Sequence, residues 1–417
     1  MNVEVPQRKF WQYIGPGVLV AVGYMDPGNW ATDLEAGSRF GFNLLCVILF
    51  SSIAAMLLQS ICVRVGVVTG KDLAELCRDQ YRPWIKNILW VLAEIAIIAT
   101  DIAEVLGTAL AFNMILGVSV ETGVLLTAFN MVFVFILQGK GMRRLEALVL
   151  GFVLIILFCF VAQVFYSAPP LMEVLKGYVP RPTSLNSAHA WYVAIGIMGA
   201  TVMPHNLYLH TAVVQSRVMK SNEAELSYSI RMITWEVILS LSIAFFINSA
   251  ILIVSASAFH LNNYLDITEI QDAYKLLSPL LGASAASLLF AIALFAAGQS
   301  STITGAIAGQ VILEGFMHFH MPVWLRRAIA RVLAIIPAWF GVHYMGEHAV
   351  GKLLVGTQVI LSLQLPFAVV PLLMFAGSKD LMKNWALSRK FKTAGWAICT
   401  VIIAANVYML IRLFQES

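Results

Sequence analysis

Apolar stretches long enough to cross a lipid bilayer recur along the whole sequence, separated by short polar connections. A transmembrane helix needs roughly 20 predominantly apolar residues, and about eleven stretches reach that length. Their approximate limits are 11–38, 43–68, 87–116, 122–138, 145–166, 190–216, 232–258, 279–313, 327–341, 353–376 and 393–414. We therefore predict an all-α polytopic membrane protein in which residues 1–417 form a single transmembrane domain.

The composition excludes several other classes of protein. Only 12% of the residues are charged, whereas about 25% are charged in soluble domains. So few charges cannot cover a soluble globule of this size, which excludes a soluble enzyme, a disordered chain and a nucleic-acid-binding protein. The net charge of +4 is too small to indicate a polyanionic partner, and the five cysteines form no C-x-x-C pair or disulfide framework. The lipid bilayer is the expected partner, and no obligate protein partner is indicated.

The distribution of Lys and Arg predicts the orientation in the membrane, because cytoplasmic loops carry an excess of both. Most of the 27 basic residues fall on one side of the bilayer when the N-terminus is placed in the cytoplasm. An odd number of spans then puts the C-terminus outside. The sequence contains no N-x-[ST] glycosylation site, which favours a bacterial inner membrane over the glycosylated surface of a eukaryotic cell.

Two proline-containing motifs interrupt the first and sixth stretches, namely Asp26-Pro27-Gly28-Asn29 and Met203-Pro204-His205-Asn206. A lone proline often only bends a membrane helix. Two breaks at corresponding positions, however, indicate a transporter built from inverted repeats with its substrate site at the midplane. We predict repeats of five spans over about 11–167 and 189–376, followed by an extra helix at about 393–414.

The polar atoms at the two breaks suit a divalent transition metal. Asp26 offers a carboxylate near the membrane centre, Asn29 an amide oxygen, and the breaks free backbone carbonyls near Gly23 and Ala200. Met203 adds a soft sulfur, which favours Mn²⁺ or Fe²⁺ over Mg²⁺ or Ca²⁺. Taken alone, Met203 could fill the core and Asn29 could cap a helix, and His205 could be a hydrogen-bonded core histidine. Their convergence on the two breaks favours the metal site.

The third stretch carries two acids, Asp101 and Glu104, on one helix face. Acids in an apolar span are costly and commonly serve proton relays. The alternative is a structural ion pair with a basic residue such as Arg331, and a relay that ends on that arginine combines both interpretations. The amides of Gln59, Gln358 and Gln364 either join helices or complete a metal shell.

With these motifs, the sequence resembles the Nramp family of proton-coupled divalent-metal transporters along essentially its whole length. Thr69-Gly70-Lys71, Thr100-Asp101-Ile102-Ala103-Glu104 and Leu365-Pro366-Phe367-Ala368 add to the resemblance. The resemblance implies a leucine-transporter-like fold with Mn²⁺ and Fe²⁺ as substrates. The implied metal ligands are Asp26, Asn29, the Ala200 carbonyl, Met203 and Gln358. The implied proton pathway is Asp26, Asp101, Glu104, His205 and Arg331. Gly23 stands where alanine is expected in some relatives, but only its carbonyl is needed.

We therefore predict a secondary active importer of Mn²⁺ and Fe²⁺, coupled to protons and working by alternating access. The metal ion is a substrate, and no cofactor is expected. A membrane-embedded metalloenzyme is the first alternative, although thioether and amide ligands are poorly suited to activating water. A passive metal channel is the second.

Overall fold

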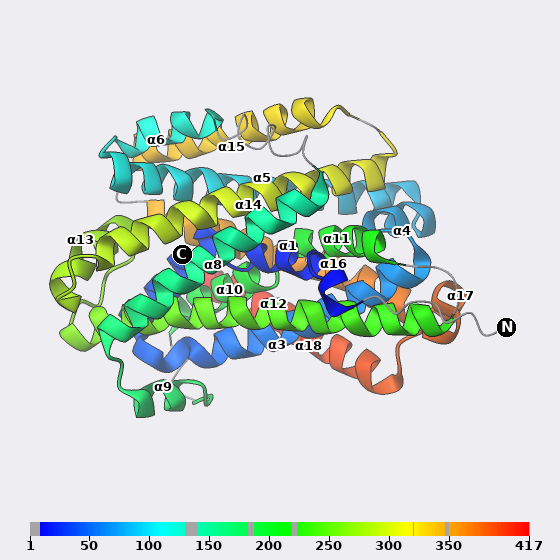
Figure 1. Ribbon diagram of the computed structural model, residues 1–417, viewed down its shortest axis with the longest axis horizontal. Coiled ribbons are helices and arrows are strands. Elements are labelled where there is room, and N and C mark those ends of the chain that lie inside the picture. The colour runs from blue at the N-terminus through cyan, green and yellow to red at the C-terminus, as the bar shows by residue number, and fades with distance from the viewer. Residues whose placement is uncertain are drawn as a thin grey trace.

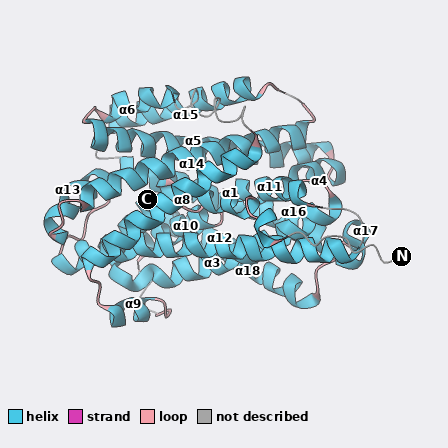
Figure 2. Cartoon of the chain, viewed as in Figure 1, coloured by secondary structure: helices cyan, strands magenta, loops and turns pink. Residues whose placement is uncertain are grey.

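The computed structural model describes residues 9–129, 141–181, 185, 187–218, 223–319, 321–346 and 350–416. Over these residues the chain is helical with no strand (Figure 2). The principal helices are α1 Pro16–Gly23, α2 Pro27–Phe40, α3 Leu45–Thr69, α4 Leu73–Gln80, α5 Pro83–Leu116, α6 Val120–Leu126, α8 Met142–Ser167, α9 Leu171–Gly177, α10 Ala188–Thr201, α11 Pro204–Val213, α12 Glu223–Ala258, α13 Ile270–Leu281, α14 Ala286–Met317, α15 Val323–Met345, α16 Val350–Gly377, α17 Lys379–Met382 and α18 Arg389–Glu416.

Each predicted membrane stretch coincides with helix, although positions 130–138 of the fourth stretch lie outside the described residues. Within the described part of the chain, seven helical segments are long and apolar enough to cross a membrane. The halves of the two broken spans are shorter than a membrane is thick, because α1 has 8 residues, α10 has 14 and α11 has 10. The all-helical membrane fold predicted from the sequence is confirmed.

One predicted boundary is wrong. The eighth stretch was expected to begin at Pro279, but that proline lies inside α13, and α14 begins only at Ala286. Gly282 separates the two helices with a φ of +62°. Glycine adopts this left-handed conformation without steric cost and so ends α13 there.

Long helices lie on either side of the short ones. In Figure 1, α5 and α14 run along one side of the bundle and α12 and α3 along the other, with α1, α10 and α11 between them. The half-helices contact both sides, since α12 packs against α1 and α2 while α14 packs against α1 and α11. Trp30 of α2 is fully buried, with its ring 4.8 Å from that of Phe160 and 5.2 Å from that of Phe290. The two helix breaks are therefore held inside the bundle.

The outer surface of the bundle is apolar. Phe158, Val161 and Phe165 of α8 are exposed, as are Leu239 and Phe246 of α12. Water would disfavour such a surface, whereas lipid chains accept it, and helices leave no backbone group unsatisfied in contact with them. The chain is an integral membrane protein.

Candidate functional site

The first break separates α1 from α2 and is organised by Asp26. This residue is the N-cap of α2, and its Oδ1 accepts hydrogen bonds from the Asn29 backbone N–H at 2.9 Å and from Asn29 Nδ2 at 2.6 Å. Pro27 at the first helical position has no N–H to offer. Among the described residues, nothing donates to Asp26 Oδ2, although the side chain is fully buried. An unsatisfied buried carboxylate oxygen is costly, so it calls for a partner such as a water molecule or a cation.

The second break separates α10 from α11, and Met203 occupies the N-cap of α11. The side chain of Met203 is fully buried and packs with Ala96 and Ala99 of α5 and with Leu361 of α16. The break therefore places a thioether in the interior of the bundle, between α5 and α16.

A hydrogen bond joins the two breaks. Asn29 Nδ2 donates to the backbone oxygen of Ala200 at 3.2 Å, which ties the start of α2 to the end of α10. The structure thus brings together Asp26, Asn29 and Ala200, with Met203 three residues beyond Ala200.

The side chain of Gln358, in α16, lies beside the first break. A side chain at Gly28 would collide with the Gln358 amide, so the glycine is what lets this amide lie against the first break. Gln358 is fully buried, and among the described residues its Oε1 has no hydrogen-bond partner. The Gln358 amide therefore lies against Gly28, in the first turn of α2.

Sequence reasoning missed Asn248 in the middle of α12. Its Nδ2 donates to the backbone oxygen of Tyr24 at 2.8 Å and lies 3.4 Å from Asn29 Oδ1. It therefore supports both the unwound segment and the amide beside Asp26. The available signal was an amide within a predicted membrane span, and polar side chains in such spans are functional-site indicators.

The donor set at the breaks differs from that of a resident metal centre. No group of three or more His, Cys, Asp and Glu side chains able to hold a metal occurs in the described ranges. One carboxylate with amide, carbonyl and thioether donors can hold a divalent transition metal while allowing its release. Such a set fits a transported ion.

The predicted acids of α5 lie in a second polar region, against α14 and α15. Glu104 Oε1 accepts a hydrogen bond from Ser301 Oγ at 2.7 Å. Asp101 lines a cavity of about 30 Å³ together with Arg326, Arg327 and Arg331. A cavity of this size has room for about one or two water molecules.

Of these three arginines, only Arg331 was predicted from the sequence to lie near the acids of α5, but all three are buried. Arg331 Nη2 donates to Thr302 Oγ1 at 3.4 Å, and Arg326 Nη2 donates to both oxygens of Glu94, at 2.9 and 3.2 Å. Arg327 and Arg331 are four residues apart and so share a helix face. That spacing was the available signal for a buried basic cluster rather than a basic membrane edge.

His205 lies between the two polar regions. Its Nδ1 is 3.3 Å from Thr100 Oγ1, and Thr100 precedes Asp101 in α5. A second buried histidine of the same helix, His210, places its Nδ1 2.8 Å from Gln59 Oε1, and Gln59 Nε2 donates to the Tyr24 hydroxyl at 2.9 Å. The two histidines of α11 therefore make polar contacts with different helices, His205 with α5 and His210 with α3.

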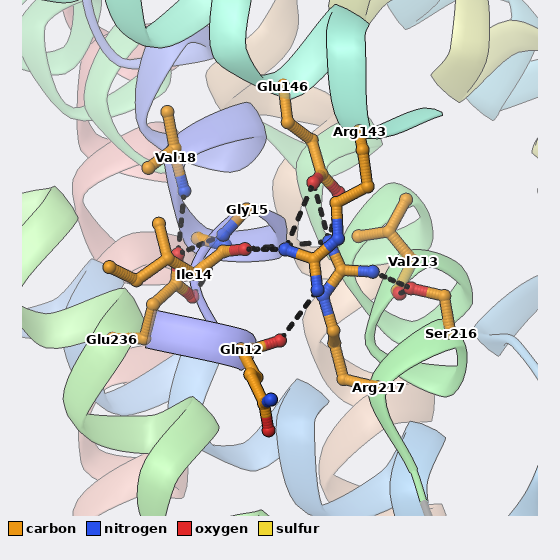
Figure 3. A network of polar contacts seen from close by, with 11 residues as sticks. Gln12, Ile14, Gly15, Val18, Arg143, Glu146, Val213, Ser216, Arg217 and Glu236 are labelled. Atoms are coloured by element: carbon orange, nitrogen blue, oxygen red, sulfur yellow. Dashed lines mark hydrogen bonds and ion pairs between the residues drawn. The ribbon is translucent and has the colours of Figure 1, made fainter. Parts of the chain in front are cut away.

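The beginning of α1 is fastened to three other parts of the bundle (Figure 3). Glu236 of α12 accepts hydrogen bonds from the backbone N–H groups of Gly15, Gly17 and Val18 at 3.0, 2.8 and 3.2 Å. A carboxylate at a helix N-terminus also meets the positive end of the helix dipole. Side chains at Gly15 and Gly17 would collide with the carboxylates of Glu146 and Glu236, respectively, so the glycines are needed there.

An ion pair and two further hydrogen bonds lie beside the start of α1. Arg217 Nη2 lies 2.5 Å from both oxygens of Glu146 in α8, and Arg143 donates to the backbone oxygens of Ile14 and Gln12 at 3.1 and 2.8 Å (Figure 3). These contacts hold the start of α1 against α8, α12 and the segment that follows α11.

We expect Arg217→Ala to destabilise the protein by about 3 kcal/mol, because it leaves the buried Glu146 carboxylate with only the more distant Arg143, at 3.9 Å, as an ion-pair partner. Thermal unfolding of the purified protein in detergent measures this. Lys176→Ala is the matched control, since it removes an exposed ion pair to Glu173 that contributes little. Equal shifts of the unfolding midpoint for the two variants would contradict a stabilising role for the buried ion pair between Arg217 and Glu146.

Taken together, the fold and the site define a membrane transport protein in which two broken helices meet at a buried polar centre. The family model described as natural resistance-associated macrophage protein-like matches residues 17–412. The chain belongs to this family, the Nramp family.

Relatives and solved structures agree with this assignment. Divalent metal cation transporter MntH 1 of Pseudomonas aeruginosa is 53% identical over 405 residues, covering 97% of this chain and 92% of the relative. MntH of Nostoc is 50% identical over 416 residues, covering 99% and 94%. The Eremococcus coleocola manganese transporter superposes with a TM-score of 0.89 at 37% identity, covering 98% of this chain and 88% of the other. Mhp1, a nucleobase-cation-symport-1 transporter, shares the fold with a TM-score of 0.63 at 13% identity, covering 96% and 92%.

Proposed function

We propose that this chain imports divalent transition-metal ions, Mn²⁺ and Fe²⁺ above all, together with protons. The observation that carries the proposal is the hydrogen bond that joins the two breaks beside Asp26, a buried carboxylate whose Oδ2 has no partner among the described residues. A cation bound there would satisfy that oxygen. The relatives named above are a divalent metal cation transporter and a manganese transporter, which supports a metal ion as substrate and transport rather than an enzymatic reaction.

The proposed ligands are Asp26, Asn29, the Ala200 carbonyl, Met203 and Gln358. Asp26 supplies the charge that holds a cation in a low-dielectric interior. The amide and carbonyl oxygens add weak donors without adding charge, and the sulfur of Met203 selects transition metals over Mg²⁺ and Ca²⁺.

Alternating access fits the structure better than a channel does. Asp26 and Met203 have essentially no exposed surface, and the start of α1 is held by hydrogen bonds to Glu236 and Arg217. A channel needs a continuous open path, whereas a carrier opens to one side at a time. Release would require α1 to leave Glu236.

The proposed proton pathway runs from Asp26 through His205 to Asp101 and Glu104, with Arg331 at its end. The contact between His205 and Thr100 and the cavity shared by Asp101 and Arg331 support this route. Metal and proton would then leave the breaks by separate paths, because the acids of α5 face α14 and α15 rather than the start of α1.

The proposed orientation places the N-terminus and the start of α1 on the cytoplasmic side, with the C-terminus outside.

The proposed architecture is two inverted repeats, about 11–167 and 189–376, with α18 as the extra helix. The bacterial MntH relatives support a plasma-membrane location.

The test is simultaneous measurement of Mn²⁺ and proton flux into proteoliposomes containing the purified chain. We expect saturable Mn²⁺ uptake that accelerates when the outside is acidified and that carries protons inward. Non-saturable Mn²⁺ flux would indicate a channel, and uptake without proton movement would contradict coupling.

In the same assay, Asp101→Asn should reduce proton movement more than Mn²⁺ movement. The substitution keeps the shape of the side chain but removes the group that would carry the proton beside the three arginines. We expect the ratio of protons to Mn²⁺ transported to fall at least about threefold, which requires less than about 1 kcal/mol of change in coupling. An equal loss of both fluxes would indicate that Asp101 is structural. Asp266→Ala, at an exposed carboxylate, is the control.

A further inference from the structure

A reciprocal pair of hydrogen bonds joins α18, the extra helix, to the middle of α16. Asn406 Nδ2 donates to the backbone oxygen of Ser362 at 2.8 Å, and Ser362 Oγ donates to Asn406 Oδ1 at 2.9 Å. Ser362 is fully buried and Asn406 is 4% exposed. Both ends of the asparagine amide are therefore used, in a helix whose other faces meet apolar side chains and lipid.

The backbone oxygen that Asn406 contacts needs a donor from outside its own helix. In a regular helix the N–H of residue 366 would donate to the oxygen of residue 362, but Pro366 has no N–H. A buried carbonyl left without a donor is costly in a bilayer. Asn406 supplies the missing donor from the neighbouring helix.

The same part of α16 faces the second helix break. Gln358 precedes Ser362 by one helical turn, and a side chain at Gly199 of α10 would collide with the Gln358 backbone oxygen and the Ser362 side chain. The end of α10 is thus in close contact with the turn of α16 that runs from Gln358 to Ser362. On its other side, that turn is held by Asn406.

The extra helix also contacts α10 directly. The rings of Trp191 in α10 and Tyr408 in α18 lie 4.8 Å apart. Because α18 contacts both α10 and α16, it ties together two helices that carry proposed metal ligands, Ala200 and Gln358.

We propose that Asn406 is a positioning residue for the metal site: its amide replaces the N–H that Pro366 removes and fixes the turn of α16 that carries Gln358 against the second break. This inference rests on the proposed function for the role of Gln358. It assigns α18 a part in building the site, rather than that of an appendage to the two repeats.

The test is a double-mutant cycle between Asn406→Leu and Pro366→Ala, because alanine restores the N–H and makes the asparagine unnecessary. In the chain that keeps Pro366, we expect Asn406→Leu to lower the midpoint of thermal unfolding by about 2 °C or more and to weaken Mn²⁺ binding about tenfold. In the Pro366→Ala variant, the same substitution should change each by less than half as much. Unfolding is measured on metal-free protein, and binding by titration calorimetry with MnCl₂.

Two controls separate the amide contact from packing. Ser362→Ala keeps the carbonyl contact and should weaken Mn²⁺ binding less than threefold, and Thr400→Val, on an exposed face of α18, should leave it unchanged. If Asn406→Leu alone yields no folded protein, recovery of folding by Pro366→Ala supports the inference, and failure to recover overturns it.

Equal effects of Asn406→Leu with and without Pro366→Ala would overturn the inference alone. The absence of Mn²⁺ uptake by the unsubstituted chain would instead contradict the proposed function, because the unfolding cycle does not depend on the substrate.

Discussion

Asp26→Asn should abolish Mn²⁺ uptake while leaving the protein folded. Asp26 has two roles in the structure: its Oδ1 caps α2, and its Oδ2 has no donor within the described residues. Asparagine is as good an N-cap as aspartate, so the substitution preserves the start of α2. It removes the charge, and with it the main attraction for a divalent cation.

The expected loss in Mn²⁺ uptake rate is at least about 100-fold, since removing even an indirect partner of a metal ligand costs about 10–100-fold in affinity. Uptake into proteoliposomes measures it, and thermal unfolding checks the fold. Asp26→Ala should lose uptake to the same degree and should also lose about 1 kcal/mol of stability, because it removes the cap. Asp266→Ala, at an exposed carboxylate, should keep normal uptake. Substantial uptake by Asp26→Asn would contradict its assignment as a ligand.

The positions of the two breaks were predictable from the sequence because proline acts locally. Pro27 and Pro204 each lack an N–H and restrict the residue before them. Asp26 and Met203 therefore had to be N-caps or loop residues wherever their helices packed. The membrane spans were predictable for a similar reason, since the thickness of the bilayer sets their length.

The contacts around the start of α1 were not predictable, because they join residues far apart in the chain. Glu236 contacts the start of α1 across more than 200 positions, and Arg217 pairs with Glu146 across 71. The sequence did contain a signal, since both acids fall within predicted membrane stretches, where an acid needs a partner. It could not name the partner. The same holds for Asn248, whose contacts with Tyr24 and Asn29 depend on how α12 packs.

The second large effect is expected on selectivity. Met203→Leu should let Ca²⁺ and Mg²⁺ be taken up at rates that approach that of Mn²⁺. Leucine and methionine have similar volumes, so the contacts with Ala96, Ala99 and Leu361 are largely kept. Only the sulfur is lost, and the remaining donors are oxygens, which suit hard cations as well as Mn²⁺.

We expect the ratio of Mn²⁺ to Ca²⁺ uptake to fall at least about tenfold in Met203→Leu, which corresponds to about 1.4 kcal/mol of discrimination. Competition between the two ions in proteoliposomes measures the ratio. Met382→Leu is the control, because Met382 is a fully buried methionine in α17, outside both broken spans.

The comparison separates two explanations for a methionine at this position. If Met203 only fills space between α5 and α16, then leucine should serve equally well, and Met203→Leu should retain the selectivity of the unsubstituted chain. If sulfur is a ligand, Met203→Leu loses selectivity with little loss of stability, whereas Met203→Ala loses both, because alanine also leaves a cavity beside Leu361. Retained selectivity in Met203→Leu would remove sulfur from the ligand set and leave selection among cations to the oxygens of Asp26, Asn29 and Gln358.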